Sequence, residues 1–125
     1  MTKIFAHRGA SAYAPENTME SFELAAKQGA DGIELDVHVT KDGEVVVTHD
    51  EKIDRVSNGS GFIKDMTLRE LKRLSFHNHM ESYVGAGIPT LREVLEYVST
   101  TNMDVNIELK TGIYWYPQIE EKTAF

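Results

Sequence analysis

The sequence contains no cysteine, so disulfide bonds, thiolate metal sites and cysteine nucleophiles are excluded. It also lacks long apolar runs: the first residues, MTKIFAHRG, do not resemble a signal peptide, and no segment reaches transmembrane length. Basic residues are in deficit, with 13 Lys and Arg against 20 Asp and Glu and a net charge of −7. These absences predict a cytoplasmic protein with no membrane span and no nucleic-acid partner, because such a partner would require a basic face.

What remains is the composition of an ordinary globular domain, with 125 residues of which 41% are hydrophobic and 26% are charged. The apolar patterns predict strands at about 3–6, 31–37, 44–49 and 104–109, and helices at about 18–28, 67–74 and 90–100. Strands that alternate with helices indicate a parallel α/β architecture, in which polar residues gather where the strands end.

Three short signals fix the expected starts of the helices. Asn17 is a good N-cap for the first helix, and Glu20 stands at the capping-box position. The tetrapeptide Thr-Leu-Arg-Glu occurs at 67–70 and again at 90–93, where it fits the start of the second and third helices. We interpret this repetition as shared local physics rather than as a structural repeat.

The dipeptide Asp42-Gly43 predicts a hairpin with a two-residue loop. That register would place Asp36 directly opposite His49, and residues opposite one another on two strands share a face about 5 Å apart. A slip of one residue would turn His49 to the other face, so the expectation depends on the register. If it holds, the imidazole suits a general acid or base, or a further metal ligand.

Glu34 and Asp36 lie two residues apart on a predicted strand and therefore share a face. Burial and mutual repulsion disfavour such a pair, and a divalent cation would remove both costs. Hard oxygen ligands suit Mg²⁺, Ca²⁺ or Mn²⁺. The alternative is an exposed strand face on which both acids are solvated.

Two further strand ends carry charged residues. Arg8 follows the first strand and can fork onto a phosphate, or pair with an ordinary surface acid. Glu108 and Lys110 share a face of the last strand, where they present a carboxylate and a cation together or form a surface salt bridge of little energetic value. His38 lies toward the hairpin turn, and we predict that it is mostly exposed.

Seven short motifs stand in order along the chain: HRG (7–9), PENT (15–18), ELDV (34–37), TKDG (40–43), VTHD (47–50), IPTL (88–91) and NIELK (106–110). In this order and at this spacing they resemble the glycerophosphodiester phosphodiesterase family. The resemblance implies an α/β fold of the (β/α)₈ TIM-barrel type with a small inserted segment after the second histidine, here about residues 51–88.

The resemblance also implies a role for each candidate residue. One divalent cation (Mg²⁺, Ca²⁺ or Mn²⁺) would be held by Glu34, Asp36 and Glu108, the acid–base pair would be His7 and His49, and the phosphate would be bound by Arg8 and Lys110. The implied reaction hydrolyses a small-molecule glycerophosphodiester to sn-glycerol 3-phosphate and an alcohol. Attack by the glycerol 2-hydroxyl and direct attack by water both remain open, as does the choice of acid and base.

A complete barrel needs about 250 residues, so we expect a partial, N-terminal barrel with a truncated end at 112–125. Open strand edges predict self-association, completion by another fragment, or only marginal stability. Two other functions stay open at this point. One is a phospholipase-like phosphodiesterase acting on intact lipids, and the other is an inactive metal- or phosphate-binding fragment that needs a partner to complete the barrel.

Overall fold

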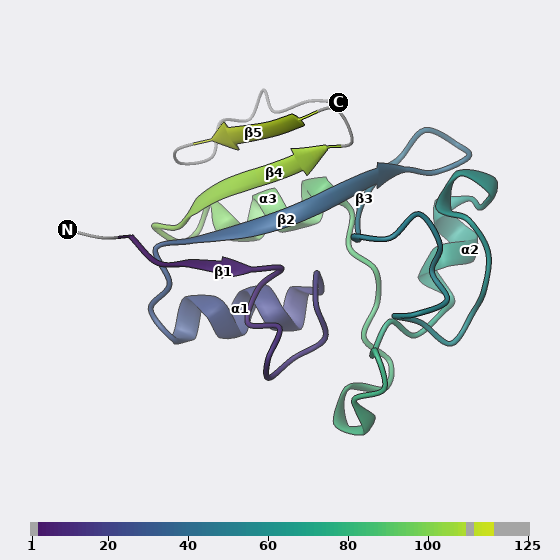
Figure 1. Ribbon diagram of the computed structural model, residues 1–125, viewed down its shortest axis with the longest axis horizontal. Coiled ribbons are helices and arrows are strands. Elements are labelled where there is room, and N and C mark those ends of the chain that lie inside the picture. Colours follow the sequence, from purple (N-terminus) through teal and green to yellow (C-terminus); the bar gives the residue numbers. More distant parts are fainter. Residues whose placement is uncertain (1–2, 110–111, 117–125) are drawn as a thin grey trace.

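The computed structural model describes residues 3–109 and 112–116, and its framework is a twisted sheet with the order β1-β2-β4-β5. Strands β1 (Phe5–His7), β2 (Gly32–Val39) and β4 (Asp104–Leu109) are parallel, whereas β5 (Gly112–Tyr116) pairs with β4 in the antiparallel sense. Strand β3 (Val45–Val47) folds back onto the end of β2. In Figure 1 the arrows of β1, β2 and β4 all point toward the segment that carries α2.

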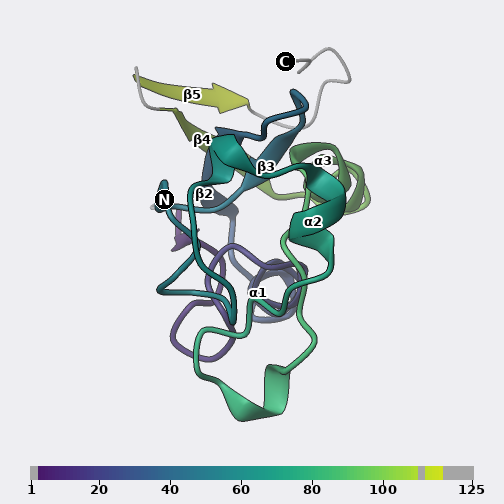
Figure 2. The same ribbon diagram turned by 90° about the vertical axis from the view of Figure 1, so that its right-hand side faces the viewer.

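Helices cover one face of this sheet. Figure 2 shows α1 (Met19–Lys27) and α3 (Leu91–Val98) on the same side of the strands. The inserted segment contributes the short helix α2 (Leu68–Lys72) and two 3₁₀ turns, η1 (Ile63–Asp65) and η2 (Glu81–Tyr83). None of the helices in the described part of the chain is long and apolar enough to cross a membrane.

Alternation along the strands separates an apolar face from a polar one. Ile33, Leu35 and Val37 of β2 are buried in the main core, which also takes in Phe22 of α1 and Val94 of α3. Because successive strand residues point to opposite faces, the even-numbered residues of β2 lie on the side away from these helices. The core therefore fixes which face of the sheet carries the acidic residues.

The inserted segment has a hydrophobic core of its own. The buried members of this second core are Val46, Ile53, Val56, Ile63, Leu71, Phe76 and Ile88. Val46 belongs to β3, so the small core is anchored on the hairpin of the sheet. The inserted segment is therefore packed against the ends of the strands through buried apolar side chains.

The start of α1 corrects one prediction. Thr18, and not Asn17, is the N-cap, and it forms a capping box with Ser21 instead of Glu20. The predicted capping boxes of α2 and α3 are confirmed at Thr67 and Thr90. Asn17 is left with a positive φ of 56° and a buried side chain that serves another purpose, described below.

The loop of the β2–β3 hairpin is longer than predicted. The amide of Thr40 donates a hydrogen bond to the carbonyl of Glu44 (2.9 Å), so the loop comprises the three residues 41–43. Gly43 takes a φ of +86°, which is the left-handed conformation that ends a three-residue hairpin loop. The expected two-residue Asp42-Gly43 loop is therefore wrong.

The longer loop shifts the register by one residue. Val37 pairs with Val47, and the amide of Thr48 donates to the carbonyl of Asp36 (2.9 Å). The predicted position of His49 directly opposite Asp36 is wrong. His49 lies one residue beyond that point, after the strand has ended, so its placement depends on the contacts of its loop.

Candidate active site

The parallel register brings polar side chains from three strands to one face of the sheet. His7 pairs with Glu34, which pairs with Asn106, and two residues further along Asp36 pairs with Glu108. Paired residues of neighbouring strands point to the same side of a sheet. The three predicted carboxylates and one of the two predicted histidines thus share a face at the carboxyl ends of the strands.

The carboxylates differ in burial and do not form a closed metal cage. Asp36 is buried, Glu34 is half-buried and Glu108 is exposed. Within the part of the chain that the structure describes, no three His, Asp or Glu side chains lie close enough together to hold a metal ion. The donor atoms are nevertheless of one kind, carboxylate oxygen, which is what hard divalent cations prefer.

Asn106 adds an oxygen to this face that the sequence analysis did not single out. Its Oδ1 atom is buried and has no hydrogen-bond partner among the described residues. A buried polar atom without a partner is uncommon in native proteins and calls for an explanation. An amide oxygen beside two carboxylates is a chemically suitable donor for a hard cation, so the donor set fits the predicted metal.

Arg8 reaches the acidic face because its backbone is turned into the left-handed region, with a φ of +58°. The turn is held on both sides: the Arg8 amide donates to the carbonyl of Glu34 (2.7 Å), and the amide of Asn17 donates to the carbonyl of Arg8 (2.8 Å). The guanidinium Nε then lies 3.6 Å from Asp36 Oδ2, and Nη1 donates to Glu16 Oε2 (3.2 Å). The predicted phosphate ligand is therefore poised at the carboxylates.

Asn17 contacts the same carboxylate oxygen as Arg8. Its Nδ2 donates a hydrogen bond to Asp36 Oδ2 (3.0 Å), and the side chain is buried. Buried polar groups require hydrogen-bond partners, and this bond supplies one to the buried Asp36. Asn17 therefore orients Asp36, a role that its position within the PENT motif did not reveal.

His49 is held by the residue that follows it. Its Nδ1 hydrogen-bonds to Asp50 Oδ1 (2.8 Å), and the hydrogen bonds from Arg55 lower the pKa of Asp50 to about 2 despite partial burial. An ionised carboxylate can only accept, so Nδ1 of His49 carries the proton. In the neutral imidazole, Nε2 is then the atom with a free lone pair.

Arg55 lies between the two halves of the site. Its guanidinium donates to both oxygens of Asp50 and to both oxygens of Glu16, at 2.8–3.2 Å. Burial alone would raise the pKa of Glu16, but the hydrogen bonds and charge of Arg55 and the charge of Arg8 outweigh it and lower the pKa. Neither Glu16 nor Arg55 was a candidate from the sequence, because 39 residues separate them.

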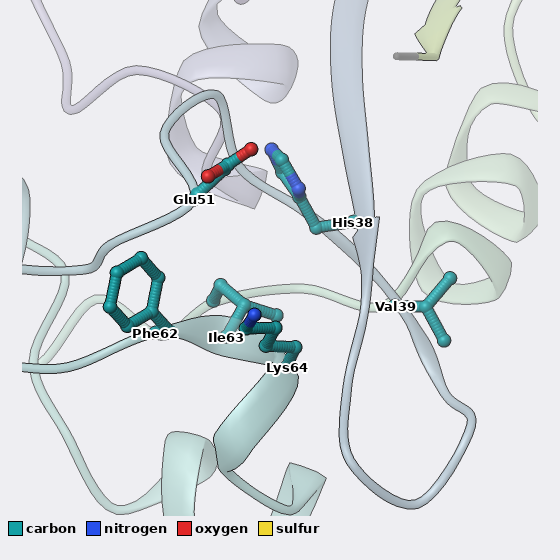
Figure 3. A pocket seen from close by; sticks show the side chains of 6 residues that line it. All are labelled: His38, Val39, Glu51, Phe62, Ile63 and Lys64. Carbon is teal, nitrogen blue, oxygen red and sulfur yellow. The ribbon is translucent and has the colours of Figure 1, made fainter. Parts of the chain in front are cut away.

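His38 supports His49 from β2. Its Nε2 donates to the carbonyl of His49 (2.8 Å), so the prediction that His38 is mostly exposed is corrected to a half-buried, hydrogen-bonded position. Figure 3 shows its ring and the carboxylate of Glu51 turned toward one another, and both side chains belong to the lining of a cavity of about 100 Å³ next to η1. Ligand pockets are several times larger, and we assign no substrate to this cavity.

The comparisons with known proteins identify the family. A family model described as "Glycerophosphoryl diester phosphodiesterase family" matches residues 7–124. The chain belongs to this family. It is 53% identical over 122 residues to the glycerophosphodiester phosphodiesterase of Caldanaerobacter subterraneus subsp. tengcongensis, covering 97% of this chain and 50% of the relative. The corresponding protein of Bacillus altitudinis is 55% identical over 124 residues, with coverages of 98% and 51%.

Solved structures of glycerophosphodiester phosphodiesterases show the same fold. The enzyme of Agrobacterium tumefaciens superposes with a TM-score of 0.84 at 44% identity, over 87% of this chain and 47% of its own. A phosphodiesterase of Oleispira antarctica, in complex with the product sn-glycerol 3-phosphate, gives 0.84 at 40% identity, over 88% and 45%. The chain spans about half the length of the relatives it matches, and the expected partial TIM-barrel type of fold is confirmed.

The structure places six of the seven predicted site residues of this family member. His7, Glu34, Asp36 and Glu108 share one sheet face, and Arg8 joins them from the loop after β1. His49 is exposed on the loop after β3, and hydrogen bonds through Asp50, Arg55 and Glu16 connect it to Arg8. Lys110 lies outside the described residues.

Proposed function

We propose that this protein hydrolyses glycerophosphodiesters to sn-glycerol 3-phosphate and an alcohol. The register of β1, β2 and β4 carries the proposal, because it sets a histidine and three carboxylates on one face at the carboxyl ends of parallel strands. Barrels of this type perform their chemistry at that end. The Oleispira antarctica phosphodiesterase, which binds sn-glycerol 3-phosphate, supports the choice of substrate class.

We include one divalent cation, Mg²⁺, Ca²⁺ or Mn²⁺, with Glu34, Asp36 and Glu108 as its ligands. The oxygen donor set and the unpartnered Asn106 Oδ1 support this assignment. Glu108 is exposed, so its side chain can reorient toward Asp36 at low cost. When bound, such a cation neutralises charge on the phosphoryl oxygens.

The chain's own residues supply the remaining functions. Arg8 neutralises and orients the phosphate with its planar guanidinium, and Lys110 is expected to add a second positive charge. His7 and His49 move the protons: one accepts the proton of the attacking hydroxyl or water, and the other protonates the leaving alcohol oxygen. Protonation is needed because an alkoxide is a poor leaving group.

A coupled assay for sn-glycerol 3-phosphate tests the proposal with glycerophosphocholine as substrate. We expect release of product with Mg²⁺, Ca²⁺ or Mn²⁺, and loss of it in Glu34→Gln and in His49→Ala. Glu23→Gln, on the exposed side of α1, is the control that should retain activity. Full turnover with a chelator present would contradict the metal assignment, and no turnover with any of the cations would contradict the activity of this chain.

A further inference from the structure

We propose that Arg55 is a positioning residue, which holds the imidazole of His49 and the guanidinium of Arg8 in their working orientations. This inference rests on the proposed function, since it assigns a role within the same site. Arg55 lies in the inserted segment after β3, close in sequence to His49 but far from Arg8. It touches neither the substrate face nor the reacting atoms in the described structure, so its action is indirect.

The single guanidinium of Arg55 makes a bidentate hydrogen-bonded contact with each of two carboxylates. Nε donates to Asp50 Oδ2 (2.8 Å) and Nη2 to Asp50 Oδ1 (3.2 Å). Nη1 donates to Glu16 Oε1 (2.9 Å) and Nη2 to Glu16 Oε2 (2.9 Å). The rigid planar fork of arginine matches carboxylates in this way, whereas the flexible ammonium of lysine cannot reproduce it.

Each of these two carboxylates also forms a hydrogen bond with one of the proposed functional side chains. Asp50 Oδ1 is 2.8 Å from His49 Nδ1, so it fixes the tautomer and the plane of the imidazole. Glu16 Oε2 accepts from Arg8 Nη1 at 3.2 Å and sets the side chain whose Nε approaches Asp36. The two sides of the site are therefore coupled through Arg55.

The exposure of the Arg55 and Glu16 side chains indicates that Arg55 contributes more to the geometry of the site than to the stability of the fold. The Arg55 side chain is 46% exposed, so water screens its ion pairs and reduces their contribution to folding. The Glu16 side chain is only 10% exposed, so its direction is well defined once Arg55 is bound. Loss of Arg55 should consequently disturb the orientation of the site more than the stability of the fold.

The test compares Arg55→Gln and Arg55→Lys with Arg69→Gln, a control at an exposed arginine of α2 in the same inserted segment. We expect kcat to fall about 10–100-fold in both Arg55 variants, because small misplacements of catalytic groups cost that much. The control should keep its activity, and circular dichroism should show that all three variants are folded under the assay conditions. In ¹⁵N NMR of the histidine rings without substrate, the fraction of His49 protonated at Nδ1 should fall in Arg55→Gln.

A double-mutant cycle shows whether Arg55 acts through Asp50. If it does, Arg55→Gln combined with Asp50→Asn loses less activity than the product of the two single losses. A multiplicative loss, or a kcat of Arg55→Gln equal to that of the control, would overturn the proposal. An unchanged His49 tautomer would also overturn it, even if the wild-type chain turns over no substrate. A changed tautomer without any turnover would support the Arg55 link and refute the proposed activity alone.

Discussion

Gly9 turns the chain directly after His7 and Arg8, and its replacement by alanine gives a sharp test of the packing behind the site. Its φ is +81°, and an added Cβ would collide with the Oγ of Ser21 and lie 2.8 Å from the Cβ of that residue. Ser21 belongs to the capping box of α1. The clash therefore falls between the loop that carries Arg8 and the first turn of the helix.

The expected magnitude has two parts. A left-handed conformation costs a residue other than glycine about 1–2 kcal/mol, and overpacking of a tight contact costs about 1–3 kcal/mol. Gly9→Ala should thus lower the free energy of unfolding by about 2–5 kcal/mol. Gly29, after α1, has nearly the same φ of +82° but nothing within 4 Å of an added Cβ, so Gly29→Ala should lose only the first part.

Urea unfolding followed by circular dichroism measures both variants beside the wild-type chain. We expect a lower midpoint for Gly9→Ala than for Gly29→Ala, with unchanged dependence of the free energy on urea concentration. The difference between the two variants isolates the contact with Ser21, because both carry the same backbone strain. Equal midpoints would refute the steric argument and would mean that the loop can move away from α1.

Two further predictions concern groups around the site. The pKa of Asp50 is about 2 in the folded chain, below its usual 3.8, chiefly because of the Arg55 hydrogen bonds; the associated stability is present above about pH 4 and is lost as the pH falls toward 2. The melting temperatures of wild type and Asp50→Asn should therefore converge as the pH falls from about 4 to about 2, and a constant difference would contradict this. Asn17→Ala should lower the free energy of unfolding by about 1–3 kcal/mol, because it leaves a buried carboxyl oxygen of Asp36 without this hydrogen bond; a loss below about 0.5 kcal/mol in urea titrations would argue that the hydrogen bond is not formed.

The parts of the site that could be predicted are those that depend on local rules. Strand alternation alone places Glu34 and Asp36 on one face, and the structure shows that face turned away from the helices. The capping boxes at Thr67 and Thr90 are likewise decided by four consecutive residues. In both cases the relevant energy comes from neighbours in the sequence, so no knowledge of the fold is needed.

The errors arise where two local solutions have similar energies and a distant contact decides between them. Both Asn17 and Thr18 are residue types that favour the N-cap position. The Asn17 side chain donates a hydrogen bond to Asp36, and Thr18 therefore caps the helix. In the hairpin, Asp42 Oδ1 accepts hydrogen bonds from the Thr40 hydroxyl and from the amide of Leu68 in the inserted segment, and this favours the three-residue loop.

The roles of Arg55 and Glu16 show a different limit of the sequence. Arg55 is one of several charged residues in a polar stretch, and no spacing rule links it to a glutamate before α1. Its partners become visible only when the inserted segment packs against the strand ends. Side chains that act through another residue are thus the hardest to find without coordinates.

The left-handed backbone at Arg8 and Asn17 implies a trade-off between thermal stability and the proposed activity. Both residues occupy a conformation that glycine would adopt without strain, and both direct their side chains at Asp36. Selection of variants for heat resistance alone should therefore enrich glycine at Arg8, which would remove the proposed phosphate ligand, whereas Asn17 should be kept for its hydrogen bond to Asp36. Selection that also demands turnover should keep the strained residues and gain its stability elsewhere in the chain.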